Sequence, residues 1–175
     1  MPLQPTVVIA LTFIPLAAAI IYMDVRYRRI PNKLVLVTLL VGLTLNTVFG
    51  GTSGLLMSMA GLALAFVLMF SLHIFGTLGA GDVKLFAAVG AVNGVSLVLP
   101  TLLVVALTGG LIAVFKMVYA RRAGRTMSGV FQFFYGLLPG QTVPRFEVPA
   151  DRSYTLPYAV PICFGSLITF LLFRA

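Results

Sequence analysis

Long stretches of this sequence carry no charged side chain. Residues 34–81 and 85–115 contain no Asp, Glu, Lys or Arg, and neither do residues 1–23 and 153–173. A membrane-spanning helix needs about 20 consecutive, mostly apolar residues, whereas a soluble domain draws about a quarter of its residues from the charged types. Only 9% of this chain is charged, and 60% is hydrophobic. The sequence therefore predicts an all-α, polytopic integral membrane protein.

The apolar runs divide into about six expected transmembrane helices. Residues 34–81 are too long for one crossing, and the glycine-rich segment 50–54 supplies a turn near the middle. Asn93, Gly94 and Pro100 divide the next run in a similar way. We expect the first span to be retained rather than removed as a signal peptide, because no basic residue precedes it. The expected spans are 6–23, 34–49, 55–76, 83–98, 101–120 and 155–173.

The basic residues indicate how these spans are oriented. The chain has 12 Lys and Arg residues against 4 Asp and Glu, and the basic ones cluster between the apolar runs, where cytoplasmic loops of membrane proteins carry them. With six spans, all but Arg174 fall on one side. We therefore expect the basic loops in the cytoplasm, both termini outside, and no nucleic-acid partner. The residues on the cytoplasmic side are Arg26, Arg28, Arg29, Lys33, Lys84, Lys116, Arg121, Arg122, Arg125, Arg145 and Arg152.

Two of the four acids stand at the ends of apolar runs. Asp24 ends the first expected span and Asp82 follows the third, so the hairpin between them returns both to the cytoplasmic face. An acid at membrane depth is costly and usually belongs to a site or a partner. Asp24 also suits a counter-ion for the arginines that follow it, and Asp82 suits a helix N-cap, a role compatible with chemistry. Glu147 and Asp151 lie beside arginines in a polar loop, and we interpret them as solvated.

Two carboxylates held together can share a proton, so that one acts as a base on water and the other as an acid. Peptide hydrolysis by such a pair needs no metal ion and no cofactor. Gly79 and Gly81 precede Asp82, and glycine lets another backbone approach closely. A substrate peptide can lie against this loop, although a plain turn between helices has the same composition. His73 and Cys163 form no metal-ligand set, and we expect His73 to bond another helix.

Three motifs resemble those of a known family. Residues 79–84, Gly-Ala-Gly-Asp-Val-Lys, resemble the GxGD motif of intramembrane-type aspartic proteases. Residues 24–32, in which an aspartate precedes Ile-Pro-Asn, resemble the first aspartate segment of type IV prepilin peptidases. Residues 156–161, Leu-Pro-Tyr-Ala-Val-Pro, are similar to the start of that family's last helix. The resemblance covers nearly the whole chain and implies one membrane-embedded peptidase domain over 1–175.

By this resemblance, Asp24 and Asp82 are the catalytic pair of a membrane aspartic endopeptidase in the inner (plasma) membrane. The implied reaction removes the short leader from prepilins and pseudopilins at the cytoplasmic face. The sequence lacks the paired-cysteine domain of methylating members and looks like the short Tad/Flp-pilus branch. An archaeal preflagellin-type peptidase would share the chemistry. The alternative from another class is a small ion-coupled transporter, or a non-catalytic pilus-assembly protein, whose aspartates bind an ion or a proton.

Other residues are expected to support the site without taking part in the chemistry. Lys84 either balances the charge of the pair or anchors the chain to anionic lipid. Pro31 is expected in the first turn of the second span, with Asn32 bonded to nearby backbone. The basic cytoplasmic loop 121–153 is expected to contain an interfacial helix on anionic lipid, because apolar side chains recur at helical spacing over 131–138. The sequence gives no indication of oligomeric state.

Overall fold

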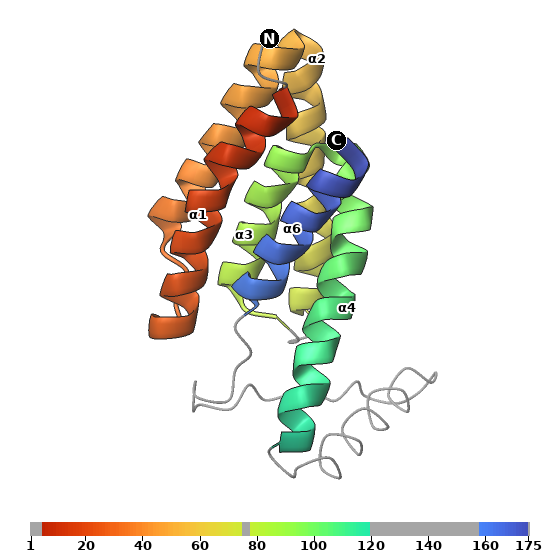
Figure 1. Cartoon of the computed structure of the whole chain (residues 1–175). Helices are drawn as coiled ribbons and strands as arrows, with labels where there is room; N and C mark the ends of the chain where they lie inside the picture. The colour runs from red at the N-terminus through yellow and green to blue at the C-terminus, as the bar shows by residue number, and fades with distance from the viewer. Residues whose placement is uncertain (1–4, 75–77, 120–157, 175) are drawn as a thin grey trace, which may run out of the picture.

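The computed structural model describes residues 5–74, 78–119 and 158–174, and every regular element in these ranges is a helix. The all-α class predicted from the sequence is therefore confirmed. The expected interfacial helix within 121–153 lies outside the described residues. The helices, shown in Figure 1, are α1 (Pro5–Tyr27), α2 (Asn32–Ile74), α3 (Ala80–Asn93), α4 (Val95–Tyr119) and α6 (Ala159–Arg174).

The long helix α2 folds back on itself at Gly51. This glycine has φ 59° and ψ −143°, a backbone conformation that is open mainly to glycine, and it lies inside the turn expected at 50–54. The side chains of Asn46 and Ser58 both donate to the carbonyl oxygen of Ala91. In a straight helix these two residues would lie about 18 Å apart along the axis. Figure 1 accordingly shows α2 as two arms that meet at one end of the bundle.

The short helix α3 is the buried centre of the bundle, with every residue from Leu85 to Asn93 buried. Both arms of α2 approach its backbone through glycines. A Cβ atom built on Gly42 would lie 2.7 Å from the nitrogen of Val92, and one on Gly61 would lie 2.3 Å from the carbonyl oxygen of Gly90. Close backbone packing of this kind is a main source of helix association where lipid removes the hydrophobic driving force.

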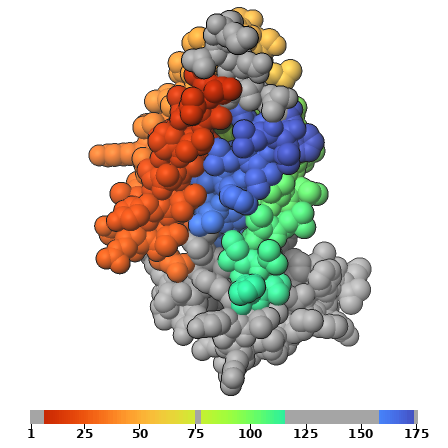
Figure 2. All heavy atoms as spheres, viewed as in Figure 1, coloured from red at the N-terminus to blue at the C-terminus, as the bar shows by residue number. Residues whose placement is uncertain are grey.

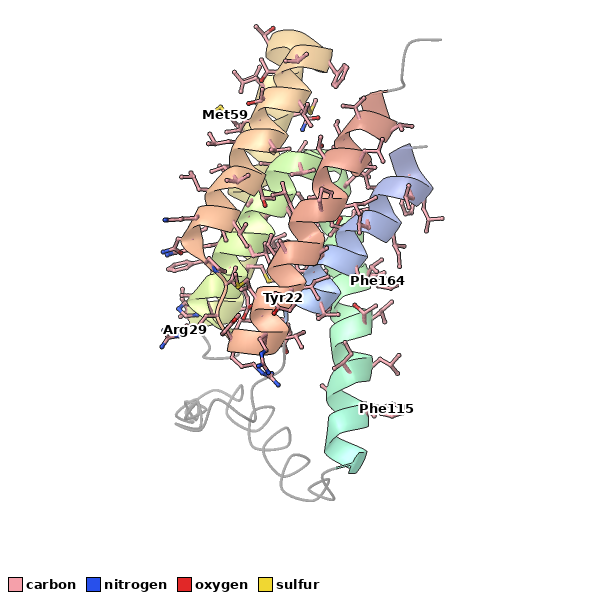
Figure 3. All side chains as sticks on the ribbon, turned by 60° about the vertical axis from the view of Figure 1, so that its left-hand side comes forward. Tyr22, Arg29, Met59, Phe115 and Phe164 are labelled. Atoms are coloured by element: carbon pink, nitrogen blue, oxygen red, sulfur yellow. The ribbon has the colours of Figure 1, made fainter. Side chains whose placement is uncertain are left out.

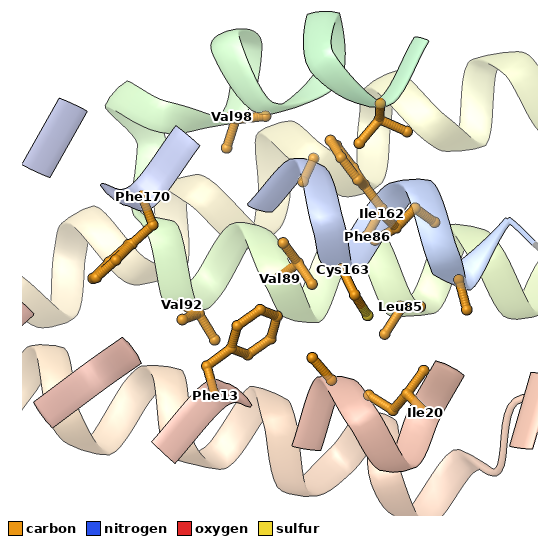
Figure 4. Close-up of a cluster of buried hydrophobic side chains, with 14 of the residues drawn as sticks. Phe13, Ile20, Leu85, Phe86, Val89, Val92, Val98, Ile162, Cys163 and Phe170 are labelled. Carbon is orange, nitrogen blue, oxygen red and sulfur yellow. The ribbon is translucent and has the colours of Figure 1, made fainter. Parts of the chain in front are cut away.

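An apolar core fills the space between α1, α3 and α6 (Figure 4). Phe13 of α1 is 2% exposed, Phe86 of α3 is 1% exposed, and Ile162 of α6 is fully buried. Cys163 is buried in the same cluster, which agrees with the behaviour of a small apolar side chain. The core therefore holds side chains of the first, central and last described helices in one cluster.

A buried polar network ties α3 to its neighbours. Asn93 donates through Nδ2 to Thr101 Oγ1 of α4 at 3.0 Å, and Ser166 of α6 donates to Asn93 Oδ1 at 3.1 Å. Buried polar groups are costly unless they are paired, so this network favours one arrangement of the three helices. In Figure 2, α6 lies between α1 and α4 on one face of the bundle.

The outer surface of the bundle is apolar. Met59, Phe115 and Phe164 point away from the bundle in Figure 3, and each is more than half exposed. Side chains of this kind are expected to face lipid. Within the described ranges, three helical segments are long and apolar enough to cross a membrane, namely Val7–Tyr27, Asn32–Ile74 and Val95–Phe115. The chain is therefore a membrane protein.

The boundary predicted between two later spans is wrong. The sequence placed spans at 83–98 and 101–120, whereas α3 ends at Asn93 and α4 continues through Pro100. The break lies at Gly94, whose φ of 77° and ψ of 165° suit glycine and not a continuing helix. Pro100 is tolerated inside α4, since prolines occur within helices of membrane proteins. Against six expected spans, three described segments reach spanning length.

Candidate active site

Asp24 and Asp82 lie at the same end of the bundle. Asp24 is in the last turns of α1 and Asp82 is in the first turn of α3. Figure 1 shows that α1 ends, and α3 and α6 begin, at this end. The two arms of α2 lead away from this end and back, which brings two carboxylates far apart in sequence to one region of the structure. We call this end of the bundle, defined by Asp24, Asp82 and Ala159, the aspartate end.

Asp24 is held by the beginning of α6. Its carboxylate is buried, with the residue 7% exposed, and Oδ2 accepts the backbone N–H of Ala159 at 3.1 Å. Ala159 is the first residue of α6, and the positive end of a helix dipole favours a negative charge there. The charge of Arg28 also acts on this carboxylate. Asp24 is therefore influenced by the charge of Arg28, in line with the counter-ion role considered from the sequence, and it also contacts α6.

Asp82 is not the N-cap of α3, contrary to the sequence-based expectation. The N-cap is Gly79, and Asp82 is the third residue of the helix. The Oδ2 atom of Asp82 accepts the backbone N–H of Gly79 at 3.2 Å, which is the contact that an acid makes in a capping box. The expectation failed because α3 begins at Ala80 and not at Val83, with a glycine backbone as its cap.

The pKa of the Asp82 carboxyl lies above its ordinary value. Burial and, to a smaller extent, the charge of the Asp24 carboxylate raise the pKa of Asp82 to about 6, and the hydrogen bond from Gly79 opposes this rise. The aspartate end therefore holds an acid with a raised pKa together with a second carboxylate whose charge acts on it and which α6 contacts, an arrangement that can serve as an acid–base pair.

Tyr158 is a third polar group at the aspartate end. It directly precedes Ala159, whose N–H binds Asp24, and its ring carbon Cε1 would lie 3.6 Å from a Cβ atom on Gly109 of α4. Burial raises the pKa of the Tyr158 hydroxyl, and the charge of Asp82 raises it further. Tyr158 is not among the site residues predicted from the sequence. The feature of the sequence that could have identified Tyr158 is its position, because a phenol stands there at the very start of an apolar helix.

The residues expected to support the site lie around the same end. A Cβ atom on Gly81 would meet the side chain of Ile30 at 3.8 Å, an ordinary contact distance, so packing does not require glycine there. Pro31 precedes α2 instead of lying in its first turn, and its carbonyl accepts the N–H of Leu34 at 3.0 Å. The two remaining expected residues, Asn32 at the start of α2 and Lys84 in α3, are exposed.

Comparison with known families agrees with the motifs at this site. The model of the type IV leader peptidase family matches residues 11–114, more than half of the chain. The matched range contains both Asp24 and Asp82, as well as the hairpin of α2 between them. Comparisons with curated proteins and with solved structures found no match. The chain belongs to the type IV leader peptidase family.

Proposed function

We propose that this protein is a membrane aspartic endopeptidase that removes the leader from Flp-type prepilins and pseudopilins, with Asp24 and Asp82 as its catalytic pair. Membership of the leader peptidase family makes the chain a protease of the membrane. The observation that best supports the aspartic mechanism is that Asp24 and Asp82 lie at the same end of the bundle, where the charge of Asp24 acts on Asp82. The beginning of α6 completes the site through the contact from Ala159.

The contacts support different roles for the two aspartates. Asp24, ionised and bonded to the Ala159 N–H, accepts a proton from a water as its oxygen bonds to the scissile carbonyl carbon. Asp82, protonated, donates its proton to the carbonyl oxygen. When the carbon–nitrogen bond breaks, the proton held by Asp24 passes to the leaving amine and the hydroxyl proton returns to Asp82. Both side chains end in their starting states, with no covalent intermediate and no cofactor.

We place the active site at the cytoplasmic face of the inner membrane. Arg26, Arg29, Lys33 and Lys84 are exposed at the aspartate end, and Figure 3 shows Arg29 there. Basic residues favour the cytoplasmic side and contact anionic lipid. In this orientation α1, the two arms of α2, α3, α4 and α6 supply six crossings. The apolar helix of the substrate lies along the spans while its leader reaches the cytoplasmic face.

The test is leader removal in liposomes. The purified protein is reconstituted and given a Flp-type prepilin, and cleavage is followed by mass. We expect wild type to cleave, and Asp24→Asn and Asp82→Asn to lose cleavage by about a thousandfold or more, as members of a joint catalytic unit do. Asp151→Asn, the same change at an acid interpreted as solvated, is the matched control and should keep the wild-type rate. Cleavage that survives in either of the first two variants would falsify the pair.

A further inference from the structure

His73 makes a contact that the proposed mechanism does not use. It lies near the end of α2, and its Nδ1 atom is 2.7 Å from the carbonyl oxygen of Leu78. A carbonyl oxygen can only accept, so Nδ1 is the protonated nitrogen and donates. The sequence suggested a bond from His73 to another helix. Instead, the side chain binds the backbone just before α3, where the site begins.

A single peptide group connects His73 with Asp82. The carbonyl of Leu78 and the N–H of Gly79 belong to the same amide, and this N–H donates to Asp82 Oδ2 at 3.2 Å. The described residues contain no cis peptide bond, so the two groups point in opposite directions. A donor on the carbonyl polarises the amide and strengthens its N–H as a donor. The hydrogen bond from His73 therefore strengthens the bond that the Gly79 N–H donates to the Asp82 carboxylate.

The orientation of this amide depends on its neighbours, because Gly79 has no side chain of its own to fix it. On one side, Leu78 packs partly buried against the apolar core. On the other, His73 holds the carbonyl, and its ring lies 6.2 Å from that of Phe70, one turn earlier in α2. Removing the His73 donor would leave the amide anchored only through Leu78 and the helix start.

We propose that His73 is a positioning residue for the Asp82 carboxylate and acts through the Leu78–Gly79 peptide group. The inference rests on the proposed function, in which Asp82 is the catalytic acid. It assigns to His73, near the end of α2, the task of orienting an acid on α3, so that the end of α2 is part of the site.

Two substitutions separate hydrogen bonding from packing. His73→Phe keeps a ring of similar size without a donor, and His73→Asn keeps a donor, since the asparagine Nδ2 atom corresponds to histidine Nδ1. In liposomes with a Flp-type prepilin, we expect His73→Phe to lower kcat about tenfold with KM nearly unchanged, as for a misplaced catalytic group. His73→Asn should recover most of the loss. A role in packing alone predicts the opposite order, with Phe tolerated and Asn impaired, and that order would overturn the inference.

A second measurement does not depend on cleavage. The chain has three aspartates, Asp24, Asp82 and Asp151, so ¹³C-labelled aspartate carboxyls can be assigned by single Asn substitutions and titrated by NMR in micelles. A weaker bond to the ionised carboxylate raises a pKa, and we expect His73→Phe to move the Asp82 titration upward by roughly half a pH unit. His73→Asn should titrate like wild type. The neighbouring groups that act with Asp82, the Asp24 carboxyl and the Tyr158 hydroxyl, are the same in every variant.

The cleavage assay and the Asp82 titration together distinguish the role of His73 from the proposed catalytic pair. An Asp82 titration identical in wild type and His73→Phe would overturn the role of His73, whether or not the protein cleaves prepilins. A shifted titration together with cleavage that survives in Asp82→Asn would support the contact through the peptide group and reject the catalytic pair.

Discussion

Asp24 and Asp82 have the same side chain but are held by different elements. Asp24 is bonded to the first N–H of α6, and Asp82 is bonded to the N–H that precedes its own helix. Only the contact of Asp24 joins elements far apart in the sequence. Because α6 lies outside the range matched by the family model, this contact extends the candidate site to a part of the chain that the comparison does not cover.

The raised pKa of Asp82 predicts a falling rate on the alkaline side. The mechanism needs Asp82 protonated, and its pKa of about 6 lies above the ordinary 3.8, so the active form is lost as the pH rises through 6. We expect kcat/KM for prepilin cleavage to fall about tenfold for each pH unit above this point. Initial rates measured in liposomes from pH 4.5 to 8.5 test this. A rate that stays constant to pH 8 would show that Asp82 is not the acid.

The two glycines of the GxGD motif should respond differently to a methyl group. A Cβ atom on Gly79 would lie 3.1 Å from Asp82 Oδ2, whereas one on Gly81 would make an ordinary 3.8 Å contact with Ile30. Gly79→Ala should therefore displace the carboxylate and lower kcat. Gly81→Ala should be accepted by the fold, and alanine stabilises a helix by up to about 1 kcal/mol relative to glycine.

The same two glycine substitutions test whether the substrate peptide lies against the segment that carries Gly79 and Gly81. If it does, Gly81→Ala should raise the KM for prepilin several-fold without a loss of thermal stability, as measured by circular dichroism and cleavage assays. Wild-type KM in Gly81→Ala would argue for a plain turn.

The two aspartates could be found from the sequence, but the contacts that hold them could not. A carboxylate between uncharged runs is visible without a structure because charge is so costly in lipid. The N-cap at Gly79 and the position of Tyr158 depend on where α3 and α6 begin, and an error of three residues in a helix boundary changes which residue caps the helix. The contact between His73 and Leu78 involves backbone geometry that no residue pattern encodes.

At the scale of elements, glycines decide how closely α2 approaches α3. The Cβ position of Gly61 lies 2.3 Å from the backbone oxygen of Gly90, whereas nothing lies within 4 Å of the Cβ position of Gly50. We expect Gly61→Ala to destabilise the bundle by about 1–3 kcal/mol through overpacking, and Gly50→Ala, the matched control in the same helix, to have little effect. Unfolding in mixed micelles with increasing dodecyl sulfate, followed by circular dichroism, measures both. Equal stability of the two variants would contradict the close packing.

The sequence predicted the turn in α2 but not which helix is central. The turn at 50–54 was visible because glycines interrupt a run too long for one span. The central position of α3 was not, because all of the helices are apolar on every face and so lack the polar stripe that marks a solvent-facing side. The break at Gly94 was likewise assigned in part to Pro100, since both residues interrupt helices and only the backbone conformation distinguishes them.

At the scale of the whole molecule, the exposed basic side chains that the structure describes gather at one end of the bundle. Exposed basic residues lie at the aspartate end, whereas the turn between the two arms of α2 lies at the opposite end and is rich in glycine (Figure 1). The aspartate end should therefore face the cytoplasm and the turn of α2 the outside. Cys163, the single cysteine of the chain, is buried, so engineered cysteines can be labelled against a low background.

We predict that a cysteine at Ser53, exposed in the turn of α2, reacts with a membrane-impermeant maleimide in intact bacterial cells. A cysteine at Arg29, exposed at the aspartate end, should react only after the membrane is permeabilised, since the thiol needs contact with water that carries the reagent. Both variants are made with Cys163→Ala, and that background alone is the control. Labelling of Arg29→Cys in intact cells would place the aspartates outside. Protection of both cysteines until permeabilisation would mean that the hairpin of α2 does not cross the membrane.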